Sequence, residues 1–110
     1  MHTIIDDASQ TFTIINTFIV APADADEIVD ALRDFTERVT FDMRGFVGAS
    51  VHLGRDRTRV VNYVQWESED DFRAMFATDD AKEHMAALGT IATQIDPVVY
   101  DVVYVGTFQI

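Results

Sequence analysis

The chain has 110 residues, of which 48% are hydrophobic and 25% charged, so it has the size and composition of one ordinary globular domain rather than of a disordered or fibrous protein. It contains no cysteine, which excludes disulfides, a thiolate nucleophile and cysteine-ligated metals. Its formal net charge of -11 argues against nucleic acid as a partner, because an acidic surface repels phosphates.

The amino-terminal residues carry no targeting pattern. Residues 1–10 lack a basic segment followed by an apolar one. No apolar run in the chain approaches the roughly 20 residues that a membrane helix needs. We therefore expect a cytoplasmic protein without a membrane partner, with residues 1–10 as a flexible segment and residues 11–110 as a single domain.

The first strand and the first helix follow one another near the start of that domain. Residues 12–20 are dense in β-branched and aromatic side chains and predict a strand that ends before Pro22. Asp24 to Glu27 then resembles a capping box. Apolar side chains recur after it at helical spacing, namely Ile28, Leu32, Phe35 and Val39. This pattern predicts an amphipathic helix with one buried stripe.

Two further strands are predicted on either side of a short turn. Residues 46–53 begin after Gly45, which breaks the preceding helix, and read as the second strand. Residues 54–56 are typical of a turn, and residues 60–66 read as the third strand. Strands so close in sequence are expected to pair as an antiparallel hairpin.

A broken helical region and a last strand complete the chain. Ser68 and Thr78 each stand where an N-cap is expected, which predicts two successive helical segments. The second segment covers residues 81–88 and should end at Gly89. The apolar run 98–105, directly after Pro97, predicts the final strand.

The predicted order βαββαβ defines the fold class. It is the α+β, ferredoxin-like arrangement, in which helices cover one face of a four-stranded antiparallel sheet. All four strands are too apolar for the other face to meet water. We therefore expect two chains to pack sheet against sheet as a homodimer, forming a dimeric α/β barrel.

Polar side chains interrupt two of the apolar strands. Asn62 and Trp66 project from the same side of the third strand, because side chains alternate along a strand. If that side meets the helices, an amide and an indole N–H line an apolar pocket suited to a flat, hydrophobic ligand with polar edges. The alternative is that both groups serve only packing. Asn16, midway along the first strand, is open to the same two interpretations.

The segment Val60-Val61-Asn62-Tyr63-Val64-Gln65-Trp66-Glu67-Ser68 resembles the signature of the antibiotic biosynthesis monooxygenase family. The resemblance extends over nearly the whole chain and is to the small cofactor-independent monooxygenases of aromatic polyketide pathways, which include quinone-forming enzymes. It implies a monooxygenase that oxidises a phenolic, anthrone-type polycyclic substrate to a quinone with dioxygen. It further implies that the enzyme needs no flavin, heme or metal, so that no cofactor is expected.

The resemblance also implies roles for individual residues. Asn62 would hydrogen-bond a substrate carbonyl or phenolate oxygen, and Trp66 would donate its indole N–H while stacking on the rings. Apart from the resemblance, His84 and, after it, His52 are the candidates for proton transfer, because histidine titrates near neutral pH. The alternatives are that His84 is an ordinary exposed helical residue and that His52 faces the partner subunit. The further residues expected to contact substrate are Asn16, Phe18, Val64, Phe72, Met75 and Phe76.

Two positions depart from the family pattern, and two other functions compete. Val51 and Phe72 replace tyrosines of the actinorhodin-type enzyme, which leaves the substrate and any proton relay open. A heme-degrading branch of the same fold would use Asn16 and, as iron ligand, His84, but Met75 occupies the place of its helical Trp. A non-catalytic barrel that binds a small hydrophobic metabolite is the third interpretation.

Overall fold

The computed structural model describes residues 11–108, so the predicted flexible segment 1–10 lies outside the described residues. The elements in chain order are β1 (Phe12–Ile19), α1 (Ala25–Arg38), β2 (Phe46–Leu53), β3 (Arg59–Trp66), α2 (Glu69–Phe76), α3 (Asp79–Ile91) and β4 (Gln94–Tyr100). Short 3-10 turns precede α1 (Pro22–Asp24) and β2 (Thr40–Asp42).

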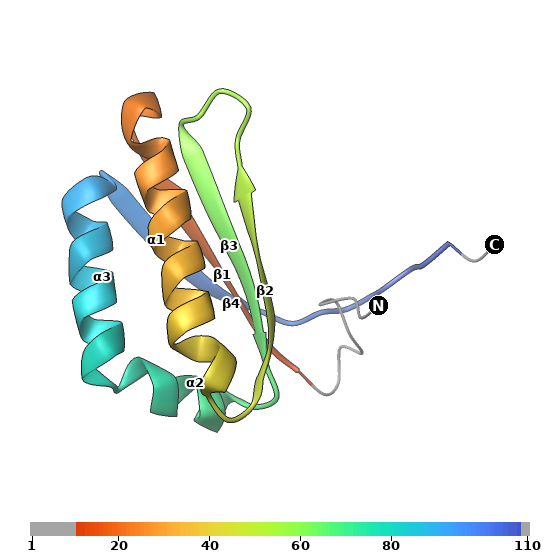
Figure 1. Cartoon of the computed structure of the whole chain (residues 1–110). Coiled ribbons are helices and arrows are strands. Elements are labelled where there is room, and N and C mark those ends of the chain that lie inside the picture. Colours follow the sequence, from red (N-terminus) through yellow and green to blue (C-terminus); the bar gives the residue numbers. More distant parts are fainter. Residues whose placement is uncertain (1–10, 109–110) are drawn as a thin grey trace.

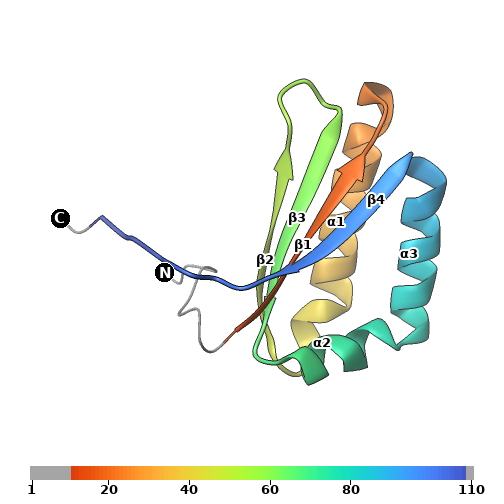
Figure 2. The same cartoon turned by 180° about the vertical axis from the view of Figure 1, so that it is seen from behind.

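The strands form one antiparallel sheet in the order β2-β3-β1-β4. Helices α1 and α3 lie side by side across one face, and α2 lies at one end (Figure 1). The view from behind shows the opposite face of the sheet without a helix over it (Figure 2). The predicted ferredoxin-like fold is confirmed. None of the helices within residues 11–108 is long and apolar enough to cross a membrane.

The buried stripe of α1 holds the helix layer onto the sheet. Ile28 and Leu32 are 0% and 2% exposed and belong to one core cluster with Phe18 of β1 and Val60 of β3. Phe35, one turn further along α1, is also buried. These positions are those that the helical spacing predicts, and Val39 lies just beyond the end of the helix.

Two of the three predicted helix caps are confirmed. Ser68 Oγ accepts a hydrogen bond from the Asp71 N–H at 3.1 Å, and Thr78 Oγ1 accepts one from the Ala81 N–H at 3.1 Å. The capping box at Asp24 is wrong, because its side chain caps nothing. Pro22 starts a 3-10 turn there, and the backbone N–H of Ala25 donates to the Pro22 carbonyl instead.

The predicted helix end at Gly89 is also wrong. α3 continues through Gly89 to Ile91, and the backbone N–H of Thr93 then donates to the Ile19 carbonyl at 2.8 Å. The chain therefore enters the sheet earlier than expected, and β4 covers Gln94–Tyr100 rather than residues 98–105. Pro97 lies inside the strand, which is tolerated because β4 is an edge strand paired only with β1.

Candidate functional site

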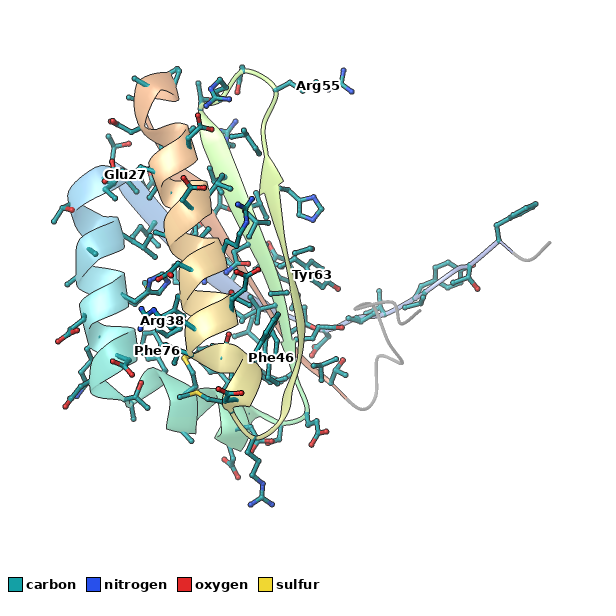
Figure 3. All side chains as sticks on the ribbon, in the orientation of Figure 1. Glu27, Arg38, Phe46, Arg55, Tyr63 and Phe76 are labelled. Carbon is teal, nitrogen blue, oxygen red and sulfur yellow. The ribbon has the colours of Figure 1, made fainter. Side chains whose placement is uncertain are left out.

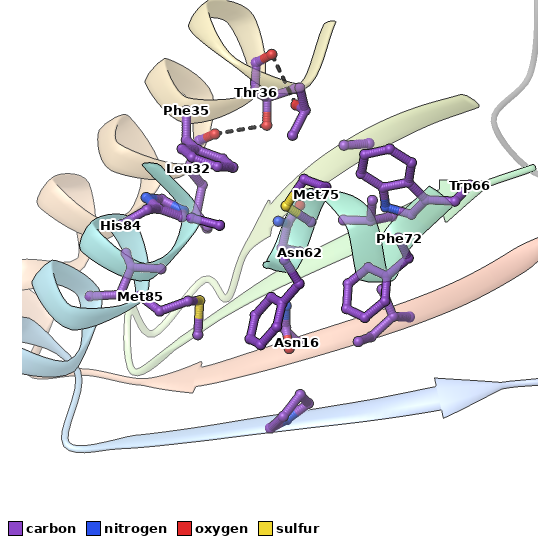
Figure 4. A pocket seen from close by; sticks show the side chains of 18 of the residues that line it. Asn16, Leu32, Phe35, Thr36, Asn62, Trp66, Phe72, Met75, His84 and Met85 are labelled. Atoms are coloured by element: carbon purple, nitrogen blue, oxygen red, sulfur yellow. Dashed lines mark hydrogen bonds between the residues drawn. The ribbon is translucent and has the colours of Figure 1, made fainter. Parts of the chain in front are cut away.

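A cavity of about 360 Å³ lies between the sheet and the helices. Its volume falls in the range of small-molecule sites, about 300 to 1,000 Å³. Figure 4 shows side chains from both layers pointing into it. Aspartate, glutamate, lysine, arginine and tyrosine are absent from the lining within the described residues. The cavity is therefore an apolar space with a few uncharged polar groups.

The sheet contributes three of those polar groups. Asn16 of β1 and Asn62 of β3 stand directly opposite each other in the antiparallel register, and both line the cavity. Trp66 lies four residues after Asn62 on the same side of β3. Asn62 is 8% exposed and Trp66 is fully buried. Parity along two neighbouring strands thus brings two amides and an indole onto one surface.

These polar groups have unused hydrogen-bonding capacity. Within the described residues, the side-chain oxygens of Asn16, Asn62 and Gln65 and the indole N–H of Trp66 are buried and find no hydrogen-bond partner, and all of these residues except Gln65 line the cavity. A buried polar group without a partner costs roughly 1 to 3 kcal/mol. Side chains that serve packing alone rarely persist with such a cost, whereas a ligand with polar edges would supply the missing partners.

Aromatic rings surround Trp66 at one end of the cavity (Figure 4). Phe46 and Phe72 approach the indole edge-on, with ring centroids 5.4 and 6.5 Å away. Phe72 in turn stacks on Phe76 at 5.6 Å, and Phe76 is 48% exposed. Flat apolar surfaces of this kind suit a polycyclic aromatic ligand.

Helix α3 contributes His84, and α1 and the 3-10 turn after it contribute one threonine each. His84 projects from α3 and stacks in parallel on Phe35 of α1, with centroids 4.1 Å apart and 5° between the planes. Burial, followed by the positive charge of Arg38, lowers the pKa of His84, and the negative charge of Asp34 opposes this. Thr36 and Thr40 donate their hydroxyls to backbone carbonyls at 2.8 and 3.0 Å, as the dashed lines in Figure 4 mark.

The structure brings together all the residues that the sequence nominates for the site except His52. The cavity-lining members of that set are Asn16, Phe18, Asn62, Val64, Trp66, Phe72, Met75, Phe76 and His84. His52 does not join them: it projects from the opposite face of β2, where Ser50 Oγ lies 2.9 Å from its Nε2. Tyr63 likewise points away from the helices (Figure 3).

Some residues that line the cavity were not predicted from the sequence. Phe35 and Met85 line the cavity from α1 and α3. Phe35 belongs to the predicted buried stripe of its helix, so its helical spacing could have placed it beside the site. Met85 offered no such signal, because its position depends on how α3 packs against the sheet.

Comparisons with known proteins agree on one family. Residues 11–87 match the family described as antibiotic biosynthesis monooxygenase. The chain is 49% identical over 73 residues to the Tetracenomycin-F1 monooxygenase of Streptomyces glaucescens, a match that covers 66% of this chain and 65% of that protein. The match therefore spans somewhat less than two thirds of that relative's length.

Two solved structures share the fold and at least 25% sequence identity with this chain. A monooxygenase from the gene ActVA-Orf6 of Streptomyces coelicolor, solved in complex with the ligand nanaomycin D, is 27% identical with a TM-score of 0.80, covering 94% of this chain and 96% of that one. SnoaB, a cofactor-independent oxygenase from Streptomyces nogalater, is 25% identical with a TM-score of 0.71, covering 87% and 96% respectively.

Proposed function

The chain belongs to the antibiotic biosynthesis monooxygenase family, and on that premise we propose that it is a cofactor-independent monooxygenase. Its substrate is a phenolic, anthrone-type polycyclic aromatic, which it oxidises to a quinone with dioxygen. The observation that carries the proposal is the set of unpartnered polar atoms on Asn16, Asn62 and Trp66 inside an apolar cavity. The oxygenase names of its relatives support the same reaction class.

The chemistry follows from the spin of dioxygen. Ground-state dioxygen is a triplet, so a closed-shell substrate reacts with it only after donating one electron. A deprotonated anthrone is electron-rich enough to do so, giving a substrate radical and superoxide. The two radicals combine at the ring carbon to give a peroxide anion, which takes back the proton that the substrate lost. Loss of water from the resulting hydroperoxide leaves the quinone carbonyl. One oxygen atom enters the product and the other leaves as water.

The protein's part is to bind the substrate, favour its anion and exclude water. The Asn62 amide can accept from a phenol O–H or, turned about its last torsion, donate to the phenolate oxygen. The Trp66 N–H donates to a second ring oxygen. His84 accepts the proton, since it is the one side chain of the described lining whose charge changes near neutral pH.

Replacing Trp66 with phenylalanine separates its two roles. The ring remains available for stacking while the N–H donor is lost, so kcat/KM for anthrone oxidation should fall roughly 10-fold, the worth of one hydrogen bond of about 1.4 kcal/mol. Oxygen consumption in a closed electrode cell measures this. An unchanged kcat/KM in Trp66→Phe would remove the N–H from substrate binding. A wild-type protein that consumes no oxygen with any anthrone would favour the non-catalytic binding barrel.

The heme-degrading alternative is tested separately. Asn16 and His84 line the same cavity, as that alternative needs. The described lining offers no arginine or lysine to pair with heme propionates, however, and the chain carries a net charge of -11. Hemin titration should therefore give no Soret band that depends on His84. A stoichiometric band that disappears in His84→Ala would favour heme.

The uncovered face of the sheet supports a homodimer as the working form. Tyr63, Ile15 and Val98 form an apolar row across β3, β1 and β4 on that face. Val98 is 37% and Tyr100 48% exposed, and a second copy of the same face would cover them under two-fold symmetry. Sedimentation velocity at micromolar concentration should show twice the chain mass of 12.4 kDa. A single 12.4 kDa species would contradict the dimer.

A further inference from the structure

The stacked pair of Phe35 and His84 joins the two helices at the wall of the cavity. His84 lies three residues after Ala81 and four before Leu88, and both of these residues are buried, so His84 belongs to the buried face of α3. Phe35 belongs to the buried stripe of α1 and is 7% exposed. Figure 4 shows the two rings together, at the other end of the cavity from Trp66 and Phe72.

The geometry of the stack controls how the imidazole can act. Two rings at 4.1 Å and 5° lie face to face, so one face of the imidazole is covered by hydrocarbon. Its plane is held by the packing of α1 against α3. The ring nitrogens lie in that plane, at the edge of the ring, and stay available for a hydrogen bond. A phenylalanine in this position keeps water off that face of the ring without competing for its nitrogens.

The charged side chains around the Phe35–His84 pair have less influence on the protonation of His84 than its burial has. The charged groups whose fields reach His84 are Asp34 and Arg38, both from α1. They pair with each other at 3.2 Å on the exposed side of the helix, so their influences on His84 partly cancel. The described cavity lining contributes no charged side chain from the sheet, α2 or α3. Burial under hydrocarbon is therefore the main cause that lowers the pKa of the imidazole.

We propose that Phe35 is a positioning residue, which shields one face of the His84 ring from water and holds the ring edge-on to the substrate so that it can take the substrate's proton. This proposal rests on the proposed function, because a base is needed only if the substrate must be deprotonated. It assigns a role in catalysis to a side chain that touches the base rather than the reacting atoms.

The test is the Phe35→Leu variant, followed by NMR titration of His84 in the intact protein. Removing the ring admits water to the imidazole face, so the His84 pKa should rise toward its ordinary value of about 6.5. The acid limb of the kcat/KM profile for anthrone oxidation should move upward by the same amount. Phe72→Leu is the matched control, since it removes a ring from the far end of the same cavity and should leave the His84 pKa unchanged.

Three results of these measurements would overturn the proposal. An unchanged or lowered His84 pKa in Phe35→Leu overturns the proposal, and so does an equal rise in Phe72→Leu. A raised His84 pKa without a matching shift of the acid limb also overturns the proposal, because Phe35 would then control the pKa of His84 without affecting the reaction. If the wild-type protein oxidises no anthrone, the proposed function fails, while the NMR comparison still decides whether Phe35 controls the state of His84.

Discussion

Replacing Asn62 with alanine should lower kcat for anthrone oxidation by about 10²-fold or more, the usual cost of removing one donor to a developing oxyanion. The amide is 8% exposed, stands opposite Asn16 and has a side-chain oxygen without a partner. Within the described residues that oxygen accepts no hydrogen bond, so we expect the amide to contribute through its contact with the substrate. Steady-state oxygen consumption at saturating anthrone measures the loss.

The stability of the same variant distinguishes a functional amide from a structural one. An asparagine kept for packing makes hydrogen bonds whose loss destabilises the fold, typically by about 1 kcal/mol or more. The unpartnered oxygen of Asn62 has no such bond to lose, so Asn62→Ala should unfold in urea at a midpoint no lower than that of the wild type. Unchanged turnover together with a lower midpoint would assign Asn62 to packing and remove it from the mechanism.

Replacing His84 with glutamine should lower kcat/KM by about 10² to 10⁴-fold, the range for loss of a general base. Glutamine keeps a hydrogen-bonding end but cannot take a proton near neutral pH. No other side chain of the described cavity lining could substitute, since it lacks aspartate, glutamate, lysine and tyrosine. His52→Gln is the matched control: it makes the same exchange on the opposite face of the sheet and should leave turnover unchanged.

The role of His84 as a base predicts the direction in which kcat/KM changes with pH. A general base works in its neutral form, so kcat/KM should be constant near pH 7 and fall as acid protonates the imidazole. Because burial lowers the pKa of His84, the midpoint of that fall should lie below about 6.5. The limb should vanish in His84→Gln. A wild-type midpoint above that value, or a limb that survives the substitution, would place the titrating group elsewhere, for example on the substrate.

Local pattern predicted most of the framework correctly. Residues 46–53 coincide with β2, and the predicted first and third strands agree with β1 and β3 within one residue, because alternation and flanking turns are local signals. The two errors at the carboxyl end share a cause. Gly89 and Pro97 normally interrupt helices and strands. Here Leu88 belongs to the core cluster and Ile91, on the other side of Gly89, packs against it, and β4 lies at the sheet edge, so both interruptions are tolerated.

In the candidate site, too, some relations between residues follow from local spacing and others depend on the tertiary structure. The common direction of Asn62 and Trp66 follows from their spacing, since residues four apart on a strand share a face. The meeting of Asn16 with Asn62 does not, because it depends on the register of strands that lie far apart in sequence. The stack of Phe35 on His84 likewise depends on how α1 and α3 pack against each other.

The sequence by itself therefore determined the order of strands and helices, most of their bounds, and which side chains of one strand point the same way, since these follow from backbone periodicity within a few residues. Only the tertiary structure decided which face of the sheet the helices cover, which amides stand opposite each other and which ring shields the histidine. Those relations arise when long-range hydrogen bonding and burial of apolar surface bring distant segments together, and no short pattern encodes that choice.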